Sequence, residues 1–171
     1  MTIRSASLLT GLSLLVAHGA SAQSRDPYFT TFSANYDLVY HQHEATSHAG
    51  AHFDLASTFK RDAPFIGPVG EVGFNHVEGA TVSSVMGGVR VRFPNDRQFL
   101  PYAQLVAGLY HCGACSGNDF AIQGGGGLDF RLSHNNDFRV RTQVDVRHVF
   151  DDPFTFNAVR LSVGVVLPLN K

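Results

Sequence analysis

Residues 138–147 read FRVRTQVDVR. In this run apolar and polar side chains alternate, with Phe138, Val140, Val144 and Val146 on one face and Arg139, Arg141, Gln143, Asp145 and Arg147 on the other. A repeat of two is the side-chain period of a β-strand with one apolar face. The sequence therefore predicts a strand here, and it predicts that the two faces meet very different surroundings.

The same alternation recurs in seven further segments, at residues 32–41, 51–60, 66–75, 84–93, 101–110, 120–132 and 159–167. Short connections rich in turn residues separate several of them, as at 61–64, 94–97 and 133–137. Short hairpins make neighbouring strands antiparallel, and closing an even number of strands removes exposed edges. We therefore predict an all-β fold, an eight-stranded antiparallel up-and-down transmembrane β-barrel.

The direction of the apolar face decides between two kinds of barrel. A soluble lipocalin-like carrier, secreted or periplasmic, would turn it inward toward an apolar ligand, whereas a membrane barrel turns it toward lipid. Within the alternating segments no Asp, Glu, Lys or Arg falls on the apolar face. Glycines such as Gly88, Gly125 and Gly164 share the polar face with the arginines, which favours a crowded interior in which small residues make room for guanidinium groups.

Seven arginines and five carboxylates are then predicted to face the interior. Because an isolated buried charge is costly, we expect them to pair with one another and to plug the lumen, leaving no large pore. This predicted lumen charge network comprises Asp37, Asp54, Glu71, Arg90, Arg92, Asp129, Arg131, Arg139, Arg141, Asp145, Arg147 and Arg160. Aromatic residues near the strand ends, Tyr110 and Phe138 among them, resemble the girdles of membrane barrels.

The beginning of the chain predicts export. Arg4 precedes an apolar run from Leu8 to Ala17, and small residues follow at Ala20 and Ala22. This pattern is typical of a signal peptide, and a run of that length is too short for a membrane-spanning helix. We predict a signal peptide at 1–22 and a single β-barrel domain at 23–171, located in a bacterial outer membrane.

Composition excludes several partners. Without Arg4 the 13 basic side chains become 12, against 14 acidic ones, so no basic surplus is present to attract nucleic acid. Eighteen apolar residues never occur in succession after residue 23, which excludes a transmembrane helix. A mean hydropathy of -0.01 agrees with strands in which only every second residue is apolar.

Three motifs, taken in order, resemble the OmpA/OmpX-like outer-membrane β-barrel domain family of Gram-negative bacteria. They are GGVRVRF at 87–93, LPYAQL at 100–105 and GGGGLDFRL at 124–132, and the resemblance spans roughly residues 30 to 169. It implies a structural or adhesive role without shared catalytic residues. It also implies outer-membrane lipid as surroundings and the barrel-assembly machinery as a partner during insertion.

The end of the chain departs from that family, whose members commonly finish on an aromatic residue. This chain finishes LPLNK at 167–171, and we expect the assembly machinery to read Ser162, Gly164, Leu167 and Leu169 instead. We expect a monomer without a cofactor.

Histidines are frequent near the end of the barrel opposite the chain termini. His41, His43, His48, His52, His76 and His111 form the candidate divalent-metal site at the extracellular loops, because imidazole is a ligand of zinc and copper. The alternative is that histidine serves there as an ordinary polar loop residue, since the spacing matches no metal motif.

Cys112 and Cys115 lie in a glycine-containing hairpin rather than at a helix N-terminus, where a redox-active pair would be expected. In an oxidising compartment we predict a disulfide between them.

An outer-membrane enzyme that modifies lipid A is the second alternative function. It would need a nucleophile, a base and an acid close together, and the candidates are Ser116 or Ser84 with His148 and Asp151. Their spacing matches no catalytic motif, so we predict no catalytic residues.

Overall fold

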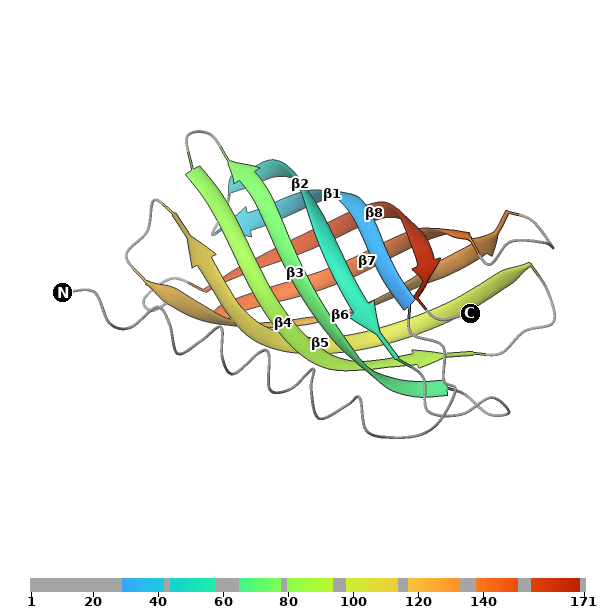
Figure 1. Ribbon diagram of the computed structural model, residues 1–171. Helices are drawn as coiled ribbons and strands as arrows, with labels where there is room; N and C mark the ends of the chain where they lie inside the picture. The colour runs from blue at the N-terminus through green and yellow to red at the C-terminus, as the bar shows by residue number, and fades with distance from the viewer. Residues whose placement is uncertain are drawn as a thin grey trace.

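The computed structural model describes residues 29–41, 44–57, 65–77, 80–93, 98–113, 117–132, 138–150 and 155–169. The predicted signal peptide at 1–22 and the turns at 61–64, 94–97 and 133–137 lie outside these residues. The described chain consists of eight long strands (Figure 1): β1 (Phe29–His41), β2 (Glu44–Ala56), β3 (Phe65–Val77), β4 (Ala80–Arg92), β5 (Phe99–Cys112), β6 (Asn118–Arg131), β7 (Arg139–Phe150) and β8 (Phe156–Pro168).

Each strand pairs with the next in antiparallel fashion, and β1 pairs with β8 to close the barrel. Across that seam Ala34 lies opposite Val163 and Asp37 lies opposite Arg160. The backbone of every strand therefore has a hydrogen-bonding neighbour on both sides. This confirms the predicted eight-stranded up-and-down barrel. No helix in the described ranges is long and apolar enough to span a membrane.

The strands of the barrel have an apolar outer face and a polar inner face. Phe32, Leu105 and Val163 expose 63%, 57% and 59% of their surface, whereas Asp54, Arg141 and Asp145 are fully buried. Because successive side chains in a strand point to opposite faces, one register places all the apolar positions outside. The predicted assignment of faces is confirmed along the described strands.

Several strand starts differ from the sequence prediction, and the largest difference is in β2, which begins at Glu44 rather than near Ala51. β1 begins at Phe29 rather than near Phe32, and β3 includes Pro68, whose glycine-rich surroundings made its start ambiguous. Pro68 is tolerated because the β2–β3 ladder begins only at Ala56 and Val69. Its carbonyl oxygen accepts a hydrogen bond from the backbone N–H of Ser57 just past the end of β2.

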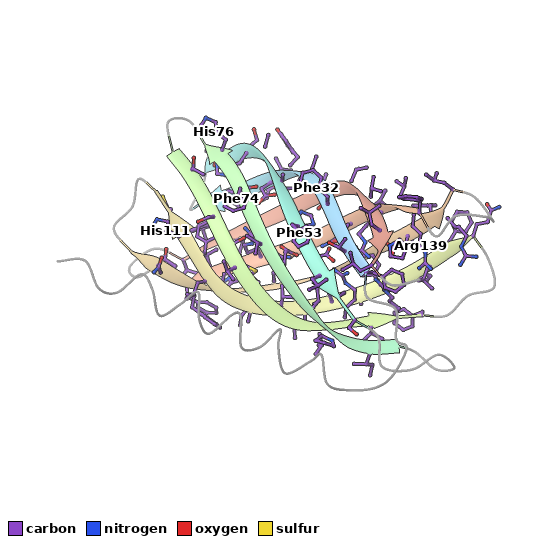
Figure 2. All side chains as sticks on the ribbon, viewed as in Figure 1. Phe32, Phe53, Phe74, His76, His111 and Arg139 are labelled. Atoms are coloured by element: carbon purple, nitrogen blue, oxygen red, sulfur yellow. The ribbon has the colours of Figure 1, made fainter. Side chains whose placement is uncertain are left out.

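The two ends of the barrel carry different side chains. We call the end where β1 starts and β8 finishes the terminal mouth, and the other end the far mouth. Figure 2 shows Arg139 at the terminal mouth, with His76 and His111 at the opposite end. Residues 42–43 and 78–79 are all that separate the strands of two hairpins at the far mouth, so at least those connections are short.

Candidate functional site: the charged lumen

In the half of the lumen toward the terminal mouth, charges of opposite sign alternate. The guanidinium of Arg141 donates to both carboxylate oxygens of Asp129, at 2.7 and 2.9 Å, and its Nη1 donates to Asp54 at 3.0 Å. Arg90 donates to the other oxygen of Asp54 at 2.9 Å. Because Asp54 lies on β2, Arg90 on β4 and Arg141 on β7, these bonds join opposite walls of the barrel.

A second cluster, centred on Arg160, fills the middle of the lumen. Arg160 on β8 binds Glu71 on β3 through two nitrogens, at 2.5 and 3.0 Å, and it also donates to Asp145 at 2.8 Å. The amide of Gln143 donates to the same oxygen of Asp145 at 2.7 Å. A planar guanidinium suits this arrangement because it offers donors in several directions within one plane.

Toward the far mouth, hydrogen bonds replace most of the ion pairing. Asp37 accepts from the amides of Asn35 and Asn75 at 2.7 and 2.6 Å, and Arg147 lies 3.8 Å from it. Arg147 also donates to Gln123 at 2.9 Å. Asp37 is thereby stabilised mainly by neutral donors, and the guanidinium of Arg147 is at the limit of a direct ion pair with it.

Tyr102 lies between two of the buried cations, a contact that sequence reasoning missed. The guanidinium carbons of Arg141 and Arg90 lie 4.4 and 4.9 Å from its ring centre, and its hydroxyl donates to Gln143 at 2.5 Å. Cation–π attraction is strongest where both groups are desolvated, as they are here. The signal available in the sequence was that Tyr102 shares its face with Gln104.

Phe29 is a second residue that the sequence did not identify. It is apolar and buried, yet its side chain lies inside the barrel at the terminal mouth. The guanidinium carbons of Arg92 and Arg139 lie 4.3 and 5.2 Å from its ring centre. An aromatic ring on the polar face is stable here because cations cover it.

An apolar cluster also occupies part of the interior. It includes Val82, Met86, Val106 and Val149, together with Tyr110, whose ring meets Phe156 edge-on at 5.7 Å between centres. The prediction that Tyr110 belongs to an outer aromatic girdle is wrong. Strand parity places Tyr110 on the same face as Tyr102, and that face points inward.

Two glycines on the inner face make room for neighbours. A methyl group at Gly125 would collide with the carboxylate of Asp145, and one at Gly127 would press on the ring of Tyr102. The predicted crowding of the interior is therefore present, but at these two positions the space serves a carboxylate and an aromatic ring rather than a guanidinium.

The predicted charge network needs one correction. Arg131 shares the inward parity of Asp129, yet it is the last residue of β6 and its side chain is exposed. A residue at a strand end is not enclosed by the barrel wall, which explains the difference. Arg92 and Arg139 lie at the same mouth and contact Phe29 as described above, while the remaining members of the predicted set lie buried in the lumen.

The candidate metal ligands are spread over different surroundings. His76 and His111 are exposed on β3 and β5, but His48 and His52 are buried inside the barrel. The expectation that His52 lies at the mouth is wrong, because β2 starts at Glu44 and His52 is well within the strand. The side chain of His41 and all of His43 lie outside the described residues.

Among the side chains that the structure describes, no group of three or more His, Cys, Asp or Glu residues is arranged to hold a metal ion. The predicted metal site therefore stays a prediction, because it includes histidines beyond those ranges. Nδ1 of His111 lies 2.9 Å from Oδ1 of Asn118 and Nδ1 of His148 lies 2.7 Å from Oδ1 of Asn157, so each already has a polar partner.

The disulfide and the catalytic candidates involve residues that the structure does not describe. Cys112 packs partly buried against the apolar cluster, but Cys115 lies outside the described residues, so the disulfide stays a prediction. Ser116 and Asp151 also lie outside them. Ser84 is buried inside the barrel, away from the lipid-facing surface that a lipid-modifying site would use.

The lumen and the exterior together exclude the lipocalin-like alternative. A carrier of an apolar ligand needs an apolar cavity inside and a polar surface outside. Here Asp54, Arg141 and Asp145 fill the inside, while Phe32, Leu105 and Val163 are among the residues exposed outside. This arrangement suits lipid tails around the barrel.

Comparison with solved structures identifies the same architecture. Neisserial surface protein A aligns with a TM-score of 0.69 and 9% identity, covering 82% of this chain and 96% of that chain. The attachment invasion locus protein Ail of Yersinia pestis aligns with 0.54 and 14%, covering 84% and 100%. The outer membrane enzyme PagL aligns with 0.53 and 16%, covering 81% and 99%. No family model and no curated protein matches the sequence.

The chain therefore has the fold of the small outer-membrane β-barrels. At these identities the likeness establishes the fold and does not carry over an activity. The fold agrees with the resemblance to the OmpA/OmpX-like barrels, and together with the apolar exterior it supports the predicted location in a bacterial outer membrane.

Proposed function

We propose that this protein is a monomeric outer-membrane barrel that supports the membrane and presents short connections at its far mouth, with neither catalysis nor a solute pore. The observation that carries the proposal is the cross-lumen ion pairing. Arg160 joins β8 to β3 and Arg141 joins β7 to β2, and all of these side chains are buried. Eight strands enclose a space that side chains alone can fill.

The structural comparisons do not identify what the surface of this protein would bind. Ail is named for attachment and invasion, and one of its structures holds the heparin analogue sucrose octasulfate. PagL is an enzyme. For this chain an interaction role is the better-supported extension, because the far mouth exposes polar side chains such as His76 and His111, whereas Ser84 is enclosed in the lumen.

Fractionation, gel mobility and conductance test this proposal. We expect the protein in the outer-membrane fraction, with a different mobility on a gel when the sample is not heated, because a closed barrel resists detergent unfolding. The refolded barrel in a planar bilayer should give no stable conductance steps. Reproducible steps from a sample that passes the mobility control would contradict the plugged lumen, and recovery in the aqueous fraction would contradict the location.

The proposed absence of catalysis is tested separately, by measuring the mass of lipid A. Cells that overproduce the protein should yield lipid A of unchanged mass, because Ser84 cannot reach a lipid from inside the barrel. A loss or gain of one acyl chain, dependent on Ser116 or His148, would establish the enzymatic alternative instead.

A further inference from the structure

Three arginines gather at the terminal mouth. Arg92 ends β4, Arg131 ends β6 and Arg139 begins β7. Arg92 and Arg139 share the ring of Phe29, and Arg131 lies directly opposite Arg139 as the last pair of the β6–β7 ladder. Among the side chains that the structure describes, positive charge is therefore concentrated on the lumen side of this end of the barrel.

Arg92 is a buried cation whose charge is not neutralised within the described residues. Its side chain is 2% exposed, and its Nε and Nη2 have no hydrogen-bond partner there. Asp129 acts on it through space, but both oxygens of Asp129 are already bound by Arg141. Arg90, Arg139 and Arg141 add charge of the same sign nearby. A buried charge without a counter-ion is strongly destabilising.

Arg131 and Arg139 bring a second pair of like charges together at this mouth. Like charges directly opposite each other on antiparallel strands repel. Arg131 is exposed and Arg139 is half-buried, so a solute or a lipid headgroup at the mouth can approach both side chains. An anion placed between them could contact both guanidinium groups and would also act on the charge of Arg92 beneath.

The neighbouring residues place these arginines beside lipid. Phe130 precedes Arg131 and Phe138 precedes Arg139, and each phenylalanine has the opposite, outward parity. Phe130 meets Phe99 edge-on at 5.2 Å between ring centres. Aromatic side chains are enriched where a membrane barrel meets the headgroup layer. The arginines therefore lie at the depth at which phosphate groups occur.

We propose that the terminal mouth binds a phosphate group, with Arg131 and Arg139 in contact with its oxygens and Arg92 contributing charge from beneath. Phosphate is favoured over a carboxylate because it offers more oxygens to two guanidinium forks that approach from adjacent strands. Arg92 acts through its charge because its Nε and Nη2 are closed off from solvent. The adjacent Phe130 and Phe138 favour a phospholipid headgroup as the source.

The test uses the refolded full chain in maltoside micelles, which contain no phosphate. Inorganic phosphate is titrated at about 0.1 M ionic strength, where charges further apart than about 10 Å are largely screened. Binding is followed through the arginine side-chain N–H signals in NMR spectra and through calorimetry. We expect saturable shifts at Arg131 and Arg139.

Variants separate the site from general electrostatics. R131Q should weaken phosphate binding by at least about tenfold, because one charge-assisted contact is lost. R92Q should weaken it by about tenfold through loss of charge in a low-dielectric surrounding. R147Q is the matched control, since it removes the same charge about 26 Å further along β7 and should change binding less than about twofold. Gel mobility without heating shows whether each variant folds. If R92Q does not fold, the effect of R131Q on phosphate binding alone tests the proposal.

A second titration identifies the source of the phosphate. Short-chain phosphatidylglycerol that binds more tightly than inorganic phosphate, with diacylglycerol inactive, would support a headgroup site. Inorganic phosphate binding at least as tightly would support the same site for a soluble phosphate. The proposal is overturned if neither probe produces saturable shifts, or if R147Q weakens binding as much as R131Q does.

Discussion

Arg160 shows at the scale of one residue why this interior can be charged. Its Nη1 and Nη2 donate to Glu71, and its Nε and Nη2 donate to Asp145, so all three nitrogens of the guanidinium bind a carboxylate. Lysine at this position would provide a single charged atom in place of a planar set of donors. The energetic benefit depends on completeness, because a half-paired buried charge costs more than an apolar substitute.

We therefore expect R160Q to destabilise the barrel by about 3 to 5 kcal/mol, since it leaves Glu71 and Asp145 buried without their cation. R131Q in phosphate-free micelles is the control, because Arg131 is exposed and should change stability by less than about 0.5 kcal/mol. Urea unfolding followed by circular dichroism and by gel mobility gives both values. Equal stability of R160Q and the parent chain would show that the network does not hold the barrel together.

The sequence predicted which face of the barrel wall each side chain lies on, but it did not predict which side chains contact one another across the lumen. The parity of Arg141 and Asp54 placed both inside, but nothing in their separation along the chain indicates that they touch across the lumen. Such contacts depend on the stagger of the closed barrel, which sequence periodicity does not encode. The cations on Tyr102 and Phe29 escaped prediction for the same reason.

At the scale of the strand, each element has to satisfy two environments at once. β7 exposes Val144 and Val146 on one side and buries Arg141 and Asp145 on the other. A shift of register by one residue would put guanidinium groups into lipid and valines into the charged lumen. The alternation therefore fixes the register of β7 against β6 and β8.

Val163 lies near the middle of β8 with its side chain outward. V163R should cost about 2 to 4 kcal/mol of folding free energy in vesicles, because a cation at mid-bilayer depth loses its hydration. L169R is the matched control beyond the end of β8, where the cost should fall to about 0 to 1 kcal/mol. Reversible urea titration of folding into phosphatidylcholine vesicles measures the difference. Equal costs at the two positions would mean that the outer face does not contact acyl chains.

The number and order of the strands were predictable because each carries its own alternation, whereas their ends were not. Phe29 extends β1 beyond the predicted start because it packs against Arg92 and Arg139, which belong to distant strands. Pro68 was ambiguous in the sequence because its tolerance depends on where the neighbouring β2 ends. Long-range context decides both cases.

At the scale of the whole molecule, the closure of the barrel and the separation of an apolar exterior from a charged lumen depend on each other. The β1–β8 seam extends from Phe29 to Tyr40 and leaves neither strand with a free edge. In lipid an unpaired edge would leave backbone groups without partners, at several kcal/mol for each group. The closed wall also shields the ion pairs from lipid, so the charged lumen and the apolar exterior depend on the same closure.

Fold class was thus available from the sequence as a whole, while the specific role was not. The polar face of the strands predicted a filled lumen, and the structure fills it with Arg160, Arg141 and their carboxylates. The proposed surface role depends on connections at the far mouth, whose residues carry no recognisable motif.

The most direct test of this architecture is NMR cross-relaxation between the protein and acyl-chain protons, with the barrel in phosphatidylcholine nanodiscs. Because successive side chains in a strand point to opposite faces, we predict strong transfer from acyl CH₂ groups to the side-chain protons of Leu105, Val144 and Val163, and little to the side-chain protons of Gln104, Gln143 and Ser162, their neighbours in sequence. Equal transfer to both sets, or transfer favouring the second set, would contradict an apolar face in lipid around a charged lumen.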